Sequence, residues 1–307
     1  MRLFFLSLII VSLTGCTLWH HETQSPQVQD SNHMGTFSRV EVDGDINVTL
    51  YTGDSHPRVV LFGDAAEKSR VKIVVKNGLL QIKKGKSTVN PGPIRAEIHA
   101  RYLTDFTFKG KGVITGKGIQ SRLMDITIDN DGQTQLQGHM ALRNLTIKGS
   151  GHTQIEGLQG RIVNIKLAGS PHVQLSGVVE LTSLNLEGKG WFSLYWVKSN
   201  ALKLWARDDV FVQLAGRVQN LDIELWNNAH FNGRYLRGIS VFAKTHDCST
   251  ADISVVEKQH TLALDSSNIY FYNLPEMKAD FMAYNGSVLD MREWESPFLK
   301  PYTRYNK

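Results

Sequence analysis

A unit of about 20 residues repeats along most of this chain, and it limits the possible folds more than any other feature. Residues 126–138 and residues 145–157 match nearly position for position, with alternating apolar residues on both sides of a Gly-, Asn- and Asp-containing turn. One apolar residue in each unit serves as its anchor. The anchors are Phe108, Ile128, Ile147, Leu167, Leu186, Leu204, Leu225, Ala243, Leu264 and Ala283, with a mean spacing of about 19.4 residues. Such regularity predicts a stack of similar structural units.

The pattern within each unit indicates short β-strands joined by glycine corners. Turns such as Lys148–Gly151 and Glu187–Gly190 place glycine where left-handed backbone angles are needed. We predict an all-β chain in which residues 36–290 form a single parallel β-helix of about ten coils, stacked about 4.8 Å apart and closed by N-terminal strands. Leucine-rich repeats share the period, but their fixed Asn and Leu-rich consensus are absent. An antiparallel meander is the alternative.

The N-terminus has the pattern of an export signal. Arg2 precedes an apolar run from Leu3 to Leu13, which is shorter than the roughly 20 residues that a membrane-spanning helix needs. Leu13, Thr14, Gly15 and Cys16 resemble the bacterial lipobox. We therefore expect residues 1–15 to be removed and Cys16 to be acylated, which would anchor the chain in a membrane through its acyl chains. An ordinary secretory signal is the alternative.

The residues that follow Cys16 predict a flexible tether. Residues 16–35 are polar and have no apolar period, which is typical of a linker. Lipoproteins retained in the inner membrane of Gram-negative bacteria carry Asp directly after the acylated Cys, but this chain has Thr17 there. By resemblance to that sorting rule, we expect the protein at the cell outer membrane. The adjacent His20 and His21 are interpreted as solvated linker residues rather than as metal ligands.

Composition and charge exclude several classes of protein. An apolar content of 41% supports a substantial core, and a net charge of +5 without large basic clusters argues against nucleic-acid binding. With Cys16 acylated, Cys248 has no partner for a disulfide. A lone thiol in an oxidising compartment is usually buried, and we expect burial of Cys248.

The segment before the repeats carries a family resemblance. Residues 37–50 read FSRVEVDGDINVTL, and Asn77-Gly78-Leu79 follows as a hairpin. Residues 36–290 thereby resemble the putative auto-transporter adhesin, head GIN domain family. The resemblance implies a β-helix and an adhesin-like role without a catalytic motif. After Gly190 the chain departs from the family, because glycine corners give way to Arg207–Asp209, Asn227-Asn228 and His246–Cys248.

Equivalent residues of stacked coils form surface columns, and one column is rich in rings. It reads Gln133, His152, His172, Trp191, Phe211 and His230. These rings could form a flat platform for sugars or peptides, or could only stabilise the stack. A second column contains Trp205 and Trp226, which we expect to stack on each other. The candidate binding surface is Trp191, Trp205, Phe211, Trp226, His152, His172 and His230.

Two further sets of polar residues favour structural roles. An outward column of Gln135, Gln154, Gln174, Ser193, Gln213 and Asn232 predicts amide hydrogen bonds along the axis. The carboxylates of Asp129, Asp131, Asp208 and Asp209 lie at turns, which explains them without a calcium site or an acid/base pair. Neither a metal nor a cofactor is predicted, and His152 and His172 lack further ligands.

These features predict a non-catalytic envelope lipoprotein. Its β-helix would be an adhesin-like module for a glycan or cell-surface partner, held to the membrane by its N-terminal lipid. A structural subunit of an envelope or secretion complex is the alternative, and a polysaccharide-processing enzyme is a weaker one. Residues 291–307, with Trp294, Phe298 and Tyr302, are expected to cap the last coil, and a tail that docks onto a partner is the alternative.

Overall fold

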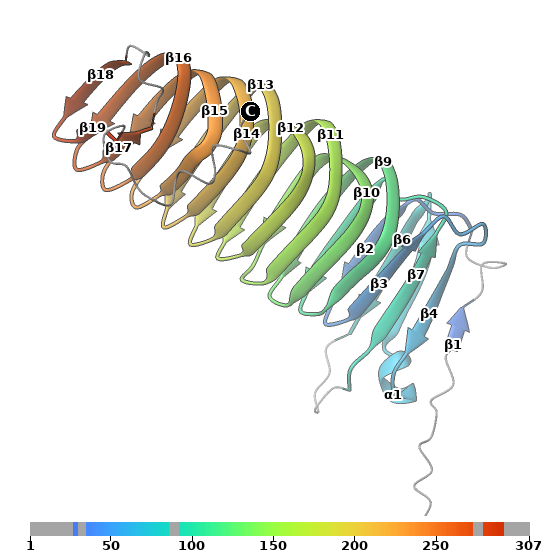
Figure 1. Ribbon diagram of the computed structural model, residues 1–307. Coiled ribbons are helices and arrows are strands. Elements are labelled where there is room, and N and C mark those ends of the chain that lie inside the picture. The colour runs from blue at the N-terminus through green and yellow to red at the C-terminus, as the bar shows by residue number, and fades with distance from the viewer. Residues whose placement is uncertain (1–26, 30–34, 86–91, 273–278, 292–307) are drawn as a thin grey trace, which may run out of the picture.

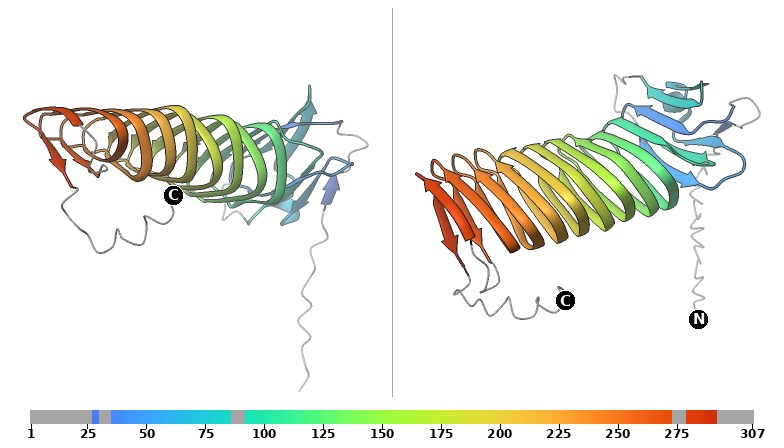
Figure 2. Two further views of the ribbon diagram at one scale, coloured as in Figure 1. Left: turned by 45° about the horizontal axis from the view of Figure 1, so that its top comes forward. Right: turned by 90° about the horizontal axis from the view of Figure 1, so that it is seen from above.

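The computed structural model shows a rod-shaped β-solenoid of about nine turns (Figures 1 and 2). It describes residues 27–29, 35–85, 92–272 and 279–291. The predicted β-helix is therefore confirmed, with about nine turns where the repeats suggested about ten. The predicted signal peptide, Cys16 and all of the predicted cap except Met291 lie outside the described residues.

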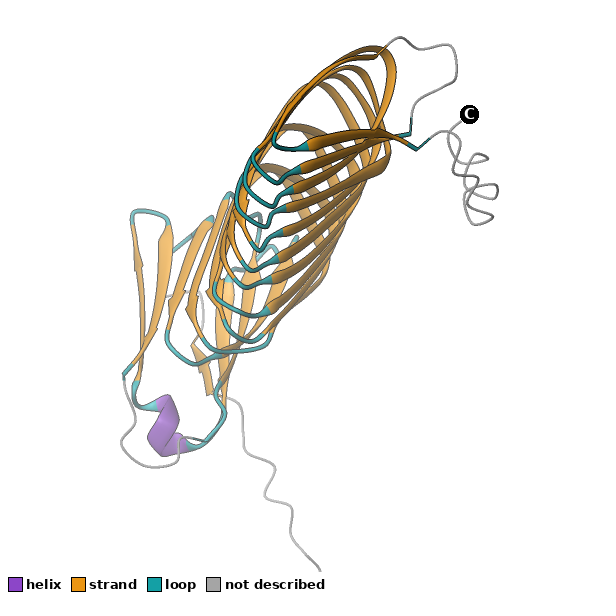
Figure 3. Ribbon diagram, turned by 90° about the vertical axis from the view of Figure 1, so that its left-hand side faces the viewer, coloured by secondary structure: helices purple, strands orange, loops and turns teal. Residues whose placement is uncertain are grey.

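Most of the rod consists of long strands that each wrap around one coil. These strands are β9 (Ile114–Asn130), β10 (Gln133–Lys148), β11 (His152–Gly169), β12 (His172–Gly188), β13 (Trp191–Asp208), β14 (Phe211–Leu225), β15 (His230–Thr245) and β16 (Thr250–Leu264). Each pairs in parallel with the next, which excludes the antiparallel meander. The coil after β16 is built from β17 (Asn268–Phe271) and β18 (Ala279–Tyr284), and β19 (Ser287–Asp290) begins a further coil by pairing with β17. Viewed from its C-terminal end, the rod shows its corners as rows of turns (Figure 3).

The pairing register shows that the repeat is a two-coil unit. The buried column that begins at Ile128 continues through Ile147, Leu167, Leu186, Ala206, Leu225 and Thr245. The step from Ile128 to Ile147 is shorter by a single residue than the step from Ile147 to Leu167, and short and long steps alternate along the column. Alternation of this kind keeps equivalent corners in register every second coil.

Three of the predicted anchors are therefore wrong. Leu186 pairs with Ala206 rather than with Leu204, and Thr245 replaces Ala243 as the partner of Leu225. The predicted and the observed anchor are alternate residues of the same strand, Leu204 and Ala206 in one case and Ala243 and Thr245 in the other. Both side chains point inward, so either residue fits the apolar pattern. Leu264 lies one residue past the column, because Ala263 is the partner of Thr245.

The interior is filled by inward-facing residues of every coil. The largest fully buried side chains include Phe106, Phe108, Phe192 and Phe231. Asn130 lies at a corner with only 3% of its surface exposed. Its Oδ1 accepts hydrogen bonds from the backbone N–H groups of Gly112 and Gly132, and its Nδ2 donates to the carbonyl oxygen of Gly112. This side chain satisfies corner backbone groups that the strand ladder does not reach.

The N-terminal strands close one end of the rod, as predicted. β2 (Arg39–Asp43) lies between β6 (Leu79–Lys84) and β8 (Asp105–Gly110), and β3 (Asn47–Thr52) lies between β7 (Arg95–Ala100) and β9. The strands that end the stack run antiparallel, with β5 (Val71–Lys76) on β6, β4 (Arg58–Phe62) on β7 and β1 (Gln27–Gln29) on β4. The short helix α1 (Ala65–Lys68) connects β4 to β5. A change to antiparallel pairing prevents another coil from continuing the parallel stack at this end.

Cys248 is exposed, contrary to the expected burial of this thiol. It lies in the turn between β15 and β16, where the backbone N–H of Cys248 donates to the carbonyl oxygen of Asn227 on the preceding coil. Neighbouring Asp247 takes a left-handed conformation with a φ of 58°. A corner of this kind directs the side chain to solvent, so the strand pattern alone could not predict its exposure.

The corner glycines offer a matched test of the stacking geometry. Gly118 and Gly157 occupy equivalent positions of the two-coil unit, with φ of 68° and 77°. A Cβ added to Gly157 would lie 1.9 Å from the carbonyl oxygen of Gly138, whereas a Cβ added to Gly118 would meet nothing within 4 Å.

We expect Gly118→Ala to lower the free energy of unfolding by about 1 kcal/mol, the cost of a left-handed alanine. Gly157→Ala adds a clash with the neighbouring coil and should cost more than about 2 kcal/mol in all. Thermal unfolding followed by circular dichroism measures both variants. Equal losses would contradict the close coil contact at Gly157.

Candidate functional site

The predicted ring column exists and forms a continuous stack, here called the ring ladder. It consists of His152, His172, Trp191, Phe211 and His230 on five successive coils. Neighbouring ring centroids are 4.8, 4.2, 6.4 and 4.9 Å apart, and no pair of ring planes differs by more than 17°. The spacing between strands is close to the distance at which rings stack, so the register itself produces the ladder.

This geometry corrects the expectation of a flat platform. A platform for sugars needs ring faces that are open to solvent, but the ladder rings turn their faces toward each other. The ring edges are left to meet solvent. The edges of His152, His172 and Trp191 carry nitrogen atoms, so the ladder can offer hydrogen bonds along the rod.

A polar column runs beside the ring ladder in the predicted register, but it does not face outward throughout, because Ser193 is fully buried. Gln135, Gln154, Gln174, Ser193, Gln213 and Asn232 occupy equivalent positions on successive coils. In this column Gln154 donates from Nε2 to Oε1 of Glu156 on the same coil, at 2.7 Å. A hydrogen bond between side-chain amides along the axis is found in another column, where Nδ2 of Asn164 donates to Oδ1 of Asn144 at 3.2 Å.

Two ladder histidines have a lowered pKa, which favours their neutral form. Desolvation lowers the pKa of His172, and the nearby imidazole of His152 lowers it further. Desolvation also lowers the pKa of His230, and Arg234 adds to this effect, while the charge of Asp252 opposes it. A neutral imidazole has one donor and one acceptor nitrogen, so both rings can donate and accept at neutral pH.

Trp205 and Trp226 do not stack on each other, contrary to expectation. Trp205 pairs with Asn185 and Glu224, and the guanidinium of Arg207 lies 5.5 Å from its ring centroid. Trp226 instead stacks on His246, with centroids 3.6 Å apart. The prediction was wrong because the anchor at Leu204 shifted the alignment by two residues. Trp226 thus belongs to the column of Arg207, next to the column of Trp205.

The carboxylates at the corners have structural partners. Nδ2 of Asn227 donates to Oδ1 of Asp208 at 2.8 Å, and Nδ2 of Asn228 donates to Oδ1 of Asp209 at 2.9 Å. These bonds tie one corner to the next. Among the described residues, no group of three or more His, Cys, Asp or Glu side chains is arranged to hold a metal ion.

Trp196 is a surface residue that the sequence analysis missed. Gly118, Gly157 and Trp196 follow one another at equal intervals, at the same corner of the two-coil unit. Like those glycines Trp196 has a left-handed backbone, with a φ of 72°. Its side chain is 64% exposed. An alignment of the chain at the two-coil period would have shown a tryptophan in place of glycine.

A left-handed backbone is costly for a bulky residue. The usual penalty is about 1–2 kcal/mol, and the exposed ring gains little burial in return. The residues on both sides of Trp196 pair with the neighbouring coils, Tyr195 with Ser176 and Val197 with Gly216. Trp196 itself is the corner residue between these two paired positions. Stability alone therefore favours glycine at this corner.

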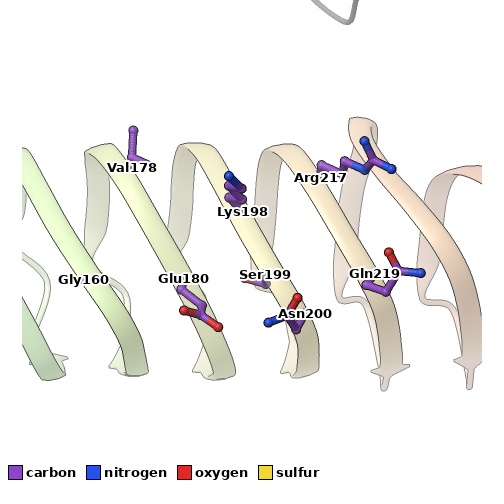
Figure 4. A pocket seen from close by; sticks show the side chains of 8 residues that line it. All are labelled: Gly160, Val178, Glu180, Lys198, Ser199, Asn200, Arg217 and Gln219. Carbon is purple, nitrogen blue, oxygen red and sulfur yellow. The ribbon is translucent and has the colours of Figure 1, made fainter.

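A shallow depression lies next to this corner, on a different part of the coil from the ring ladder. It has a volume of about 440 Å³ and crosses four coils, and its lining includes Val178, Lys198, Arg217, Glu180, Asn200 and Gln219. Figure 4 shows Val178, Lys198 and Arg217 in one row on successive coils, with Glu180, Asn200 and Gln219 in a second row. Two cations and one carboxylate therefore face the same hollow.

One known protein family matches part of this chain. Residues 36–179 match the family model described as putative auto-transporter adhesin, head GIN domain, which confirms the resemblance over this part of the chain. No match was found among curated proteins. Within the described ranges, no helix has the length and apolar character needed to cross a membrane.

Several solved structures are similar to this chain. A putative adhesin from Parabacteroides merdae is 14% identical with a TM-score of 0.46, over 87% of this chain and 95% of that one. A putative lipid binding protein from Parabacteroides distasonis is 12% identical with a TM-score of 0.42, over 87% and 97%. A putative adhesin from Bacteroides fragilis is 14% identical with a TM-score of 0.34, over 87% and 98%.

The contrast between Trp196 and Trp191 can be tested by stability. Trp196→Gly restores the corner residue of the other coils and should leave the free energy of unfolding unchanged or raise it by about 1 kcal/mol. Trp191→Gly removes a ring that stacks on two neighbours and puts glycine into a strand, so it should cost about 2 kcal/mol or more. Thermal melts of both variants give the comparison. A Trp196→Gly variant as unstable as Trp191→Gly would show that Trp196 stabilises the fold.

Proposed function

Since residues 36–179 belong to the putative auto-transporter adhesin, head GIN domain family, we propose that this chain is a non-catalytic, adhesin-like binding module of the bacterial envelope. In this proposal Cys16 carries the lipid that holds the chain at the outer membrane. The polar tether of residues 16–35 lets the rod reach a glycan or cell-surface partner.

The observation that carries the proposal is the strip formed by the ring ladder and the polar column beside it. Both columns follow the rod axis over five or more coils at the strand spacing, which gives a strip about 20 Å long. Ring nitrogens and side-chain amides repeat along it, so an extended partner can form hydrogen bonds at each coil. Because the strands fix these groups, little conformational entropy is lost on binding.

The strip can be tested without disturbing the ladder. His172→Phe combined with Trp191→Phe keeps both rings in the stack but removes their N–H groups. The loss of two hydrogen bonds should weaken binding about tenfold or more. Full-length protein, purified from membranes in detergent, is applied to arrays of glycans and cell-surface proteins. His139→Phe makes the same chemical change on an exposed histidine outside the strip and should bind like the wild type.

Two results would contradict the proposal. If the wild-type protein binds no surface and instead co-purifies with envelope proteins, the chain is a structural subunit. If the double variant binds as tightly as the wild type, the strip is not the binding surface.

The lipid anchor has its own test. Cys16→Ala removes the thiol to which the diacylglycerol group would be attached, so the protein should be absent from the outer-membrane fraction and should not be labelled by palmitate. Immunoblots of separated membrane and soluble fractions measure the change. A Cys16→Ala protein that stays in the membrane fraction would exclude the lipid as the anchor.

A further inference from the structure

The corner at Trp196 combines three features that the stability of the rod does not explain. The first is the indole itself, which is 64% exposed and has a left-handed backbone where equivalent coils have glycine. Gly177 and Gly216 on the adjacent coils carry no side chains. In the pairing register Trp196 lies opposite the Gly177-Val178 bulge on one coil and opposite Ala215 on the other, so neither neighbouring coil places a ring against the indole.

The second feature is a column of like charges. Lys198, Arg217 and Arg237 face one another on three successive coils. None of the three forms an ion pair with a carboxylate among the described side chains. Like charges directly opposite each other on neighbouring strands are destabilising. An anion bound at this column would relieve their repulsion.

The third feature is the polar lining of the depression. Glu180, Asn200 and Gln219 form the second row in Figure 4, below Lys198 and Arg217. Together they offer carboxylate and amide oxygens as acceptors and amide N–H groups as donors. Groups of this kind suit the hydroxyl groups of a sugar.

We propose that Trp196, Lys198 and Arg217 form a binding site for an anionic saccharide. One sugar ring packs on the indole, its carboxylate, sulfate or phosphate group pairs with Lys198 and Arg217, and its hydroxyls bind the polar row. The site deepens the proposed adhesin-like function and rests on it, because it names the chemical class of one external ligand. It lies apart from the ring ladder, so the two surfaces can be tested separately.

The geometry favours a saccharide over a lipid bilayer. An exposed tryptophan beside cations is also typical of proteins that lie on anionic membranes. Partition into a bilayer, however, requires no fixed orientation of the indole, whereas stacking on a sugar ring does. The left-handed backbone fixes the Cα of Trp196 two residues before Lys198, which lines the depression, and a fixed position of this kind fits a ligand of defined shape.

The test uses the full-length protein in detergent and isothermal titration calorimetry with three oligosaccharide probes. An oligogalacturonate supplies carboxylates, a sulfated oligosaccharide supplies sulfates, and a neutral galactose oligomer supplies neither. Trp196→Gly removes the ring and relaxes the corner. Lys198→Gln with Arg217→Gln removes the two cations. Lys166→Gln with Lys203→Gln removes two exposed lysines from another part of the surface and serves as the matched control.

We expect the wild type to bind at least one of the two acidic probes and not the neutral one. Trp196→Gly and the Lys198/Arg217 double variant should each weaken this binding about tenfold or more. The control double variant should stay within about twofold of the wild type. Added salt should weaken the wild type more than the Lys198/Arg217 variant.

Three results would overturn the inference. The first is wild-type protein that binds neither acidic probe, and the second is Trp196→Gly protein that binds as tightly as the wild type. The third is binding to phosphatidylglycerol vesicles through the same residues without binding to either acidic oligosaccharide, which would make the corner a membrane contact. These results would leave the adhesin-like role itself open. That role is contradicted by a different result, namely wild-type protein that binds no glycan or cell-surface protein on the arrays.

Discussion

Parallel pairing between successive coils is the interaction on which the rest of this structure depends. Each coil hydrogen-bonds to the next with an offset that alternates, so that the step from His152 to His172 is slightly longer than the step from His172 to Trp191. A regular offset places every side chain directly above its counterpart, so surface columns, buried columns and corners all follow from the register. Any coil that changed length would shift every column beyond it. The β-bulges at the corners absorb such differences, and the two-coil unit keeps its length.

Much of this architecture could be predicted from the sequence because a solenoid repeats its constraints. The approximate period, the parallel class, the N-terminal strand cap and the register of the ring ladder all follow from local patterns that recur at each coil. The wrong anchors at Leu204 and Ala243 have a physical cause, since alternate residues of a strand that wraps a narrow core are both buried. The sequence pattern determines which face points inward, but it does not determine which of two inward residues lies above a given neighbour. This ambiguity also produced the wrong pairing of Trp205 with Trp226.

The ring ladder and the corner at Trp196 use aromatic side chains in opposite ways. In the ladder the strand spacing matches the stacking distance of rings, so the faces of His172 and Trp191 are used for contacts within the rod. The same regularity that stabilises the ladder removes its ring faces from solvent. A ring face becomes available where the neighbouring coils lack a ring, as at Trp196, which lies between the Gly177-Val178 bulge and Ala215. In a repeat protein, agreement between coils thus serves stability, and a departure from the repeat can serve binding.

The next coil pair shows that the strain at Trp196 is not imposed by the presence of an aromatic residue. Tyr235 follows Trp196 after one further two-coil unit, at the same corner, and it does not have a positive φ. There the register shifts between Asn232 and Arg237, so the corner is rebuilt and the backbone is relaxed. The fold therefore has a way to hold a large ring at this corner without a left-handed residue. At Trp196 the register also shifts, between Leu194 and Val197, but here the left-handed backbone is retained, with the indole on the surface two residues from Lys198. At Tyr235, one two-coil unit away, a large ring is held without the backbone strain of a left-handed residue. The strain retained at Trp196 therefore points to a function of its exposed ring.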